Sequence, residues 1–333
     1  MSDDTHPSLR IGILGAANIA PTALIDPARR NPEVVVAAVA ARDGARAQEF
    51  ARAHGIERSY DSYTALIEAP DLDAIYIPLP NGLHGRWIRA ALAAGKHVLC
   101  EKPFTANAEE AREIAALAAA SDRVVMEAFH YRYHPLTREA ERIIAAGELG
   151  KLVRVDTALC FPLPKFGDIR YNYELAGGAL MDAGCYAVHM ARTFSGEEPE
   201  VVVARAKLRD ARIDRAMRAQ LRFPSGTIGS IRCSMWSKDL VRISATIVGE
   251  QGSIRLLNPV VPQLGHLLAV RTDSGRTLRT LSRRPSYDYQ LDAFADAVLR
   301  GKPVLTTPEQ AIANMTAIDT IYQAAGLPLR LPS

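Results

Sequence analysis

Near its N-terminus the chain reads Leu9-Arg-Ile-Gly-Ile-Leu-Gly-Ala-Ala-Asn-Ile-Ala20, an apolar run followed by a glycine turn. A dinucleotide-binding loop needs a glycine for the tight turn from strand to helix, close approach of the backbone to the pyrophosphate, and a small residue where helix meets sheet. Gly15 fits the first requirement and Ala20 the last, while Ala17 stands where a second glycine is usual. We therefore predict a nucleotide-binding loop; the alternative is a turn rich in glycine and alanine that binds no nucleotide. The residues expected to contact the cofactor here are Gly15, Ala17, Asn18 and Ile19.

Short apolar runs alternate with helical patterns through the first third of the chain. The expected buried strands are Leu9–Leu14, Val34–Ala40, Ala74–Ile77, His97–Cys100 and Val124–Met126. The expected helices are Leu83–Ala94 and Ala108–Ala120, with Gly95 as a C-cap signal and Asn107 as an N-cap signal. Parallel strands need crossover connections, which helices supply. The alternation therefore predicts an α/β Rossmann domain, a doubly wound parallel sheet, over residues 8–127.

The middle of the chain has short, partly alternating runs separated by turn signals such as Pro224-Ser-Gly226. That pattern is typical of an antiparallel sheet with one wetter face. The expected strands are Lys151–Cys160, Glu200–Leu208, Arg215–Phe223, Thr227–Trp236, Val241–Gly249 and Gly252–Leu257. The expected helices lie within Ala179–Phe194 and over Tyr287–Arg300 and Pro308–Ala325. We predict that residues 128–333 form an α+β domain with a large, mostly antiparallel open sheet, for substrate binding and oligomerisation.

Composition excludes several classes of protein. The 40 basic and 37 acidic residues are interspersed and leave a formal net charge of +3, so we expect no nucleic-acid partner. No stretch approaches the ~18 consecutive apolar residues that a membrane span needs, so we expect no membrane partner. The four cysteines lie far apart without a CxxC pair, which argues against disulfides and a metal site. With an acidic, polar N-terminus unlike a signal peptide, the sequence predicts a cytoplasmic protein.

The second expected strand ends Ala40-Ala41-Arg42-Asp43. A carboxylate at this position holds the ribose 2′-hydroxyl of NAD, whereas an arginine accommodates the 2′-phosphate of NADP. Because Ala41 is uncharged and Arg42 follows it, we predict NADP as the preferred cofactor, with NAD as the alternative. In that alternative Arg42 is a solvated charge paired with Asp43, or Asp43 itself binds the ribose.

Four further segments carry a resemblance to a known family. They are Tyr76-Ile-Pro-Leu-Pro-Asn-Gly-Leu-His84, Ala94-Gly-Lys-His-Val-Leu-Cys-Glu-Lys-Pro103, Met126-Glu-Ala-Phe-His-Tyr-Arg-Tyr-His-Pro135 and Gly177-Gly-Ala-Leu-Met-Asp-Ala-Gly-Cys-Tyr-Ala-Val-His189. In this order they resemble the glucose–fructose oxidoreductase/inositol dehydrogenase/rhizopine catabolism (Gfo/Idh/MocA) family over nearly the whole chain. The resemblance implies a Rossmann domain followed by a domain built on a large open sheet.

The Glu-Lys-Pro segment implies the first half of an active site. By the resemblance, Lys102 lies beside the nicotinamide and the substrate oxygen, and Glu101 contacts the nicotinamide ribose or holds Lys102. The Lys102–Pro103 bond is expected to be cis, a conformation largely confined to X–Pro. Further cofactor contacts are expected after the strand Ala74–Ile77, where an α/β sheet binds its ligand. These are Pro80, Asn81 and His84.

Asp182, Tyr186 and His189 are spaced i, i+4 and i+7, which places them on one helical face. Many family members have histidine where Tyr186 stands. The tyrosine version resembles the NADP-dependent branch that contains dihydrodiol dehydrogenases, glucose–fructose oxidoreductase, some xylose dehydrogenases and sugar 3-ketoreductases. His189 is expected to bond a substrate hydroxyl, with a satisfied core histidine as the equal alternative. Arg170 and Tyr171 are further expected substrate contacts, or parts of a loop over the sheet.

These residues predict a mechanism. Tyr186 is the expected general acid or base, and Lys102 is expected to favour its phenolate because a free tyrosine titrates near ~10. Asp182 is expected to orient the pair, its alternative role being a carboxylate favoured at a helix N-terminus.

The predicted function is hydride transfer between NADP and a carbinol or ketone carbon of a sugar, cyclic polyol or diol. The alternatives are a 3-keto-sugar reductase and a non-catalytic NADP(H)-binding sensor. The expected assembly is a homodimer or homotetramer formed through the open sheet face.

Overall fold

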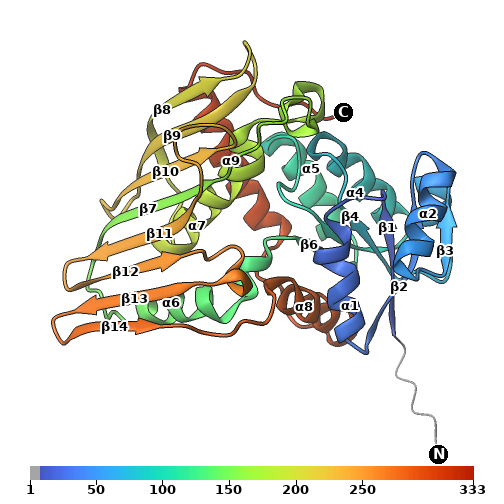
Figure 1. The fold of residues 1–333 in the computed structure, drawn as a ribbon, viewed down its shortest axis with the longest axis horizontal. Helices are drawn as coiled ribbons and strands as arrows, with labels where there is room; N and C mark the ends of the chain where they lie inside the picture. The colour runs from blue at the N-terminus through green and yellow to red at the C-terminus, as the bar shows by residue number, and fades with distance from the viewer. Residues whose placement is uncertain (1–7) are drawn as a thin grey trace, which may run out of the picture.

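A computed structural model describes residues 8–333, which form two sheets with helices around and between them (Figure 1). The first sheet is six-stranded in the order β3-β2-β1-β4-β5-β6, with every pair parallel. Its strands are β1 (Leu9–Leu14), β2 (Val34–Ala40), β3 (Arg58–Tyr60), β4 (Ala74–Ile77), β5 (His97–Cys100) and β6 (Val125–Glu127). The order reverses between β1 and β4, which defines a doubly wound sheet and confirms the predicted fold class.

Helices cover both faces of this sheet, as parallel strands require. On one face lie α3 (Tyr63–Ile67), α4 (His84–Ala93) and α5 (Ala108–Ala119), and on the other lie α1 (Asp26–Arg30) and α8 (Ser286–Arg300). Strand β3 forms one edge of the sheet, and α2 (Gly44–His54) packs against β3 and β2. The predicted caps are confirmed, because the Asn107 side chain accepts from the Glu110 N–H and Gly95 has φ +71°.

The second sheet is eight-stranded in the order β14-β13-β12-β11-β7-β10-β9-β8. Its strands are β7 (Leu152–Cys160), β8 (Glu200–Leu208), β9 (Asp214–Arg222), β10 (Ile228–Ser234), β11 (Arg242–Gly249), β12 (Gly252–Leu257), β13 (Leu267–Thr272) and β14 (Gly275–Arg279). Neighbours are antiparallel except β7 and β10, which are parallel. This confirms the mostly antiparallel sheet, with two strands, β13 and β14, beyond those predicted.

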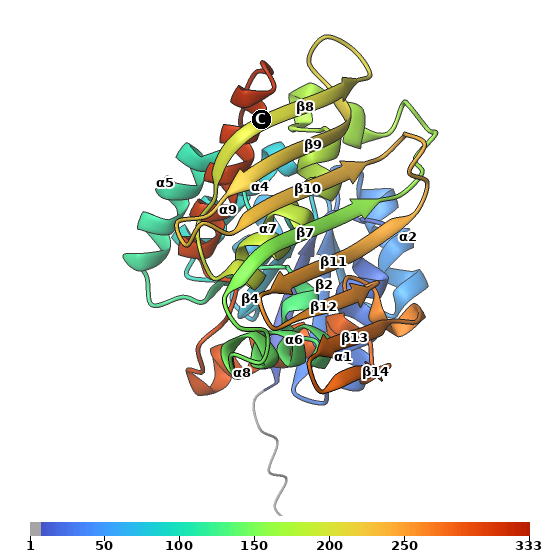
Figure 2. The same ribbon diagram turned by 90° about the vertical axis from the view of Figure 1, so that its left-hand side faces the viewer.

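One face of the second sheet is covered and the other is open (Figure 2). The covering helices are α6 (Pro135–Ala145), α7 (Cys185–Ser195) and α9 (Pro308–Ala324), of which α7 packs on β7 and β10 and α9 on β8. The open face carries arginines: Arg218 and Arg232 both reach Asp239, at 3.1 and 3.4 Å. Assembly through this face stays a prediction.

The C-terminal part of the chain returns to the first sheet. Helix α8 packs against α1 and β1, and Arg30 pairs with the buried Asp288 of α8. The Thr306 hydroxyl donates to the Glu127 carbonyl, which ties the segment before α9 to β6. The division of the chain at residues 127 and 128 stays a prediction. Within the described part of the chain, the helices are too short or too polar to cross a bilayer.

Candidate active site

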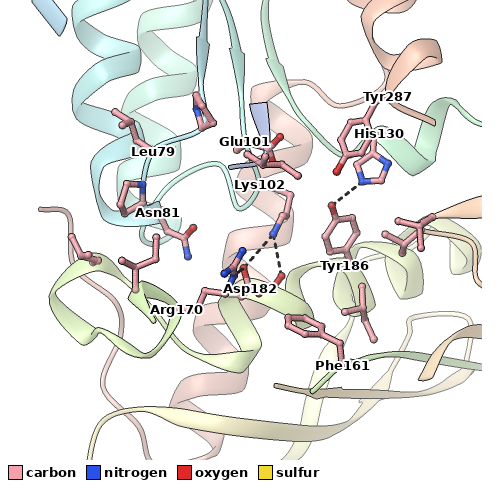
Figure 3. A pocket seen from close by; sticks show the side chains of 18 of the residues that line it. Leu79, Asn81, Glu101, Lys102, His130, Phe161, Arg170, Asp182, Tyr186 and Tyr287 are labelled. Atoms are coloured by element: carbon pink, nitrogen blue, oxygen red, sulfur yellow. Dashed lines mark hydrogen bonds and ion pairs between the residues drawn. The ribbon is translucent and has the colours of Figure 1, made fainter. Parts of the chain in front are cut away.

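A cavity of about 380 Å³ lies between the C-terminal ends of β1, β4 and β5 and the covered face of the second sheet (Figure 3). An α/β sheet binds its ligand at this point, outside the carboxyl ends of the strands where their order reverses. Many of the predicted site residues line the cavity, namely Ile19, Pro80, Asn81, Glu101, Lys102, Arg170, Asp182 and Tyr186.

The loop after β1 fits a dinucleotide. Gly15 has φ +99°, and its N–H donates to the Ala40 carbonyl at 2.7 Å. A Cβ on Gly15 would lie 3.0 Å from Leu79 Cδ2, so both the backbone conformation and the space favour glycine. Asn18 and Ile19 are exposed beyond this turn. The loop therefore has the tight turn and the accessible backbone that a pyrophosphate requires.

The end of β2 presents arginines rather than a free carboxylate. Asp43 caps α2, since its Oδ1 accepts from the Ala45 and Arg46 N–H groups at 3.0 and 3.4 Å. Arg42 is exposed, and Arg46 donates to the Ala16 carbonyl in the loop after β1. Arg46 was not predicted from the sequence, and its position four residues after Arg42 was the available signal.

Lys102 follows β5 and lies beside Asp182. Its Nζ donates to the Asp182 backbone carbonyl at 3.1 Å and lies 3.5 Å from the carboxylate Oδ1. Burial opposes the charged ammonium, but the charges of Asp182 and Glu101 outweigh it and raise the pKa of Lys102. Lys102 is therefore a cation at neutral pH. The Lys102–Pro103 peptide bond is cis, as expected.

Asp182 lies in a π-helical turn, Leu180–Gly184, immediately before α7. Its Oδ1 also lies 3.2 Å from Arg170 Nε, and Arg170 pairs at 3.2 Å with Asp168. One carboxylate thus holds two cations at the edge of the cavity (Figure 3).

Tyr186 stands in the first turn of α7, and its hydroxyl lies 3.1 Å from His130 Nε2. The Lys102 ammonium lies over the Tyr186 ring, 5.1 Å from its centroid. Burial, with smaller contributions from Tyr287 and Glu101, raises the pKa of Tyr186 well above 10. Burial dominates the ionisation of Tyr186 here, and the expectation that Lys102 favours the phenolate stays a prediction.

His189 is buried and makes its contacts within the core. It is 3% exposed, its Nδ1 lies 2.6 Å from the Tyr131 hydroxyl, and its ring stacks on Phe129 at 4.0 Å. The cavity reaches the first turn of α7, and His189 lies one turn deeper. These contacts favour the alternative of a satisfied core histidine, and a substrate contact stays a prediction.

His84 and Tyr171 both bond to backbone carbonyls, and for Tyr171 this fits the predicted alternative of a loop over the sheet. The two ring nitrogens of His84 lie 2.8 and 2.7 Å from the carbonyls of Pro103 and Leu79, and the side chain is fully buried. His84 therefore fixes the loops after β4 and β5 without presenting an atom to the cavity. The Tyr171 hydroxyl donates to the Leu163 carbonyl at 2.9 Å and holds the loop over the sheet.

The other predicted cofactor contacts occupy the near wall. The Asn81 amide donates to the Ala176 carbonyl at 3.1 Å, and Pro80 precedes it. Glu101 accepts from the Tyr76 hydroxyl at 2.7 Å, and burial raises its pKa.

Sequence reasoning missed the far wall of the cavity. His130 and Tyr287 stack there, with ring centroids 3.9 Å apart. His130 lies within the quoted segment Met126–Pro135, so its position was the only signal for it. The remaining wall is apolar, from Leu159, Phe161, Ile243, Val260 and Val261. Their side chains converge only through the pairing of distant strands.

Comparisons with known proteins agree with this geometry. The sequence profile described as "Oxidoreductase family, NAD-binding Rossmann fold" matches residues 9–129, and that of the "GFO/IDH/MocA C-terminal domain" matches residues 137–255. The chain belongs to the Gfo/Idh/MocA family. It is an NAD(P)-dependent oxidoreductase acting on CH–OH groups.

Two named relatives and one solved structure are similar to most of the chain. The D-xylose 1-dehydrogenase (NADP(+)) 2 of Haloferax volcanii is 39% identical over 95% of this chain and 97% of its own length. A trans-1,2-dihydrobenzene-1,2-diol dehydrogenase of Oryctolagus cuniculus is 38% identical over 67% of this chain and 68% of its own. The solved structure of a 3-ketoreductase from Actinomadura kijaniata with NADP and TDP-benzene has a TM-score of 0.88, at 28% identity over 96% of this chain and 98% of that one.

Proposed function

We propose that this protein transfers hydride between NADP and a secondary carbinol or ketone carbon of a sugar, cyclic polyol or diol. The observation that carries the proposal is the convergence of Lys102, Asp182 and Tyr186 in one cavity at the carboxyl ends of the Rossmann strands. NADP(H) supplies or accepts the hydride when bound, and the protein orients the substrate and manages one proton. The named relatives, a xylose dehydrogenase and a keto-sugar reductase, support a sugar as substrate.

Tyr186 is the proton donor in the reducing direction. Its raised pKa keeps the hydroxyl protonated at neutral pH, so it can give its proton to the carbonyl oxygen. The Lys102 ammonium stabilises the negative charge that develops on that oxygen. In the oxidising direction the same two groups act in reverse, with Tyr186 receiving the proton.

Asp182 keeps Lys102 charged and in place. Its carboxylate and backbone carbonyl both contact the ammonium, and its second partner, Arg170, lies at the cavity edge. Asp182 thereby acts on the reaction through Lys102. Arg170 is in reach of a substrate hydroxyl at the entrance.

NADP preference rests on the charges at the end of β2. A 2′-phosphate is best held by guanidinium groups, because their fork of donors matches its oxygens. Arg42 and Arg46 are both available there, and Asp43 is committed to capping α2.

The test has two stages. Fluorescence titration with NADPH and NADH in parallel should give much tighter binding of NADPH; no binding of either would overturn the function. NADP⁺ reduction should then be measured with D-xylose, D-glucose and trans-cyclohexane-1,2-diol, and NADPH oxidation with the corresponding ketones. Turnover with a member of this panel supports the proposal, and Lys102→Ala and Tyr186→Phe should each lower it about 10²- to 10⁴-fold. Tight NADPH binding without turnover of the panel would instead favour the non-catalytic sensor.

A further inference from the structure

His130 lies beside the Tyr186 hydroxyl (Figure 3), and its other ring nitrogen contacts a buried serine. Its Nε2 lies 3.1 Å from the Tyr186 oxygen, and its Nδ1 lies 2.7 Å from Ser286 Oγ. The side chain is 1% exposed, and its ring stacks on Tyr287. The 3-10 segment His130–Tyr133, helix α7 and helix α8 therefore all hold this ring in one orientation.

The far end of this chain of hydrogen bonds favours one direction. A backbone carbonyl can only accept, so Ser286 donates to the Val260 carbonyl, 3.5 Å away. Ser286 then accepts from the Nδ1–H of His130. The unprotonated Nε2 consequently accepts from the Tyr186 hydroxyl.

The surroundings keep the His130 ring neutral. Burial, followed by the charges of Lys102 and His134, lowers the pKa of His130 to about 3. The groups facing the ring from the elements around it are Lys102 after β5, His134 after its own segment, Tyr186 of α7, and Ser286 and Tyr287 of α8. A neutral imidazole has one donor and one acceptor nitrogen, which is what this chain of bonds requires.

We propose that His130, held by Ser286, is a positioning residue that orients the Tyr186 hydroxyl toward the substrate oxygen. In the arrangement just described, the proton is on Nδ1 and the Tyr186 hydroxyl donates to Nε2, which holds the phenol oxygen at the cavity. In the other neutral tautomer, Nε2–H donates to the Tyr186 oxygen and Ser286 donates to Nδ1, so the Tyr186 hydrogen is free to pass to a carbonyl oxygen. The phenolate left by that transfer keeps the bond from Nε2–H and, in the oxidising direction, takes the proton of the alcohol, so the ring itself receives no substrate proton. This inference rests on the proposed role of Tyr186.

A double-mutant cycle tests the coupling. His130→Phe keeps the ring stacked on Tyr287 but removes both hydrogen bonds. We expect kcat to fall about 10- to 100-fold, the effect of a misplaced catalytic group, with unchanged KM for NADPH. In the Tyr186→Phe background the same change should produce no further loss, because residues that act as a unit are not additive. An equal loss in both backgrounds would overturn the inference while leaving the proposed function intact. Full activity of Tyr186→Phe alone would overturn both.

Two more variants separate positioning from structure. His130→Gln places an amide near the position of Nε2 and should recover part of the activity lost in His130→Phe. Tyr133→Phe is the matched control, because it removes a hydroxyl of the same 3-10 segment that bonds Thr306 at 3.0 Å outside the cavity. It should show no coupling to Tyr186→Phe. Coupling as strong as that of His130→Phe would contradict the proposal.

A measurement without substrate or cofactor provides an independent readout. In protein labelled with ¹⁵N-histidine, the signals absent from His130→Phe identify the ring. They should show a neutral ring at pH 7, with Nδ1 protonated and Nε2 accepting a hydrogen bond. Tyr186→Phe should shift that Nε2 signal and leave the other histidines unchanged, and Ser286→Ala should change the tautomer balance. A charged ring, or an Nε2 signal unmoved by Tyr186→Phe, would overturn the inference.

Discussion

The Lys102 ammonium lies 3.5 Å from the Asp182 carboxylate, an ion pair that joins the segment after β5 to the turn before α7. The two residues are 80 positions apart in the sequence and come from the two sheets' separate sets of elements. Both side chains are largely buried, at 15% and 13% exposure, so solvent screens their attraction less than it would at the surface. The ionisation of Lys102 therefore depends on Asp182.

Replacing Asp182 with Asn should move the pH dependence of turnover. The Asp182 charge raises the pKa of Lys102, so removing it leaves burial less opposed and lowers that pKa. The alkaline fall in kcat should then begin at lower pH. Asp168→Asn is the control, since Asp168 pairs with Arg170 and not with Lys102. An unshifted alkaline limb in Asp182→Asn would show that Lys102 does not titrate in the reaction.

The sequence predicted the first sheet well because its strands are buried apolar runs whose ends coincide with turn signals. Strand β3 escaped notice because Arg58-Ser-Tyr60 has no apolar pattern and is only three residues long. Strand β14 is exposed along its whole length, so its sequence has no pattern of buried apolar residues. Burial did not select the residues of these two strands, so the local pattern of the sequence could not predict them.

The site was predicted only in part for a related reason. Residues fixed by a local segment, such as Lys102 and Asp182, could be selected from their motifs. The choice between His189 and His130 depends on which histidine the fold exposes to the cavity. Helical spacing favoured His189, but Phe129 and Tyr131 cover it, while α8 carries Ser286 and Tyr287 to His130 from the other end of the chain. Contacts of that kind arise from tertiary packing.

Arg42→Ala and Arg46→Ala should weaken NADPH binding while leaving NADH binding unchanged. A hydrogen bond to a charged group contributes about 1.5–3 kcal/mol, so each loss should be about 10- to 100-fold for NADPH alone. Arg52→Ala is the matched control, because Arg52 is an exposed arginine in the last turn of the same helix. Isothermal titration with both cofactors measures the effect. An equal loss for NADPH and NADH would mean that these arginines do not recognise the 2′-phosphate.

Arg330→Met should destabilise the protein strongly. Arg330 and Asp214 are both fully buried 3.0 Å apart, and Asp214 also accepts from the Leu180 N–H at the start of the turn that carries Asp182. Removing one partner of a buried pair leaves an uncompensated charge and costs about 3–5 kcal/mol. Lys302→Ala breaks an exposed pair with Asp296 and should cost less than about 1 kcal/mol. Urea denaturation compares the two; similar small losses would show that Asp214 becomes neutral or solvated.

Glu127→Gln should remove a pH dependence of stability. Glu127 ends β6, its Oε1 accepts from the Phe104 N–H at 2.9 Å, and burial raises its pKa to about 8. The unfolded chain releases this proton near pH 4.5, so between that pH and about 8 the folded state binds more protons than the unfolded state. The contribution of Glu127 to folding therefore falls as the pH rises through this interval. Glutamine keeps the acceptor for Phe104 but cannot ionise. Thermal unfolding across this interval should show wild type losing more stability than Glu127→Gln as the pH rises, and parallel curves would contradict the raised pKa.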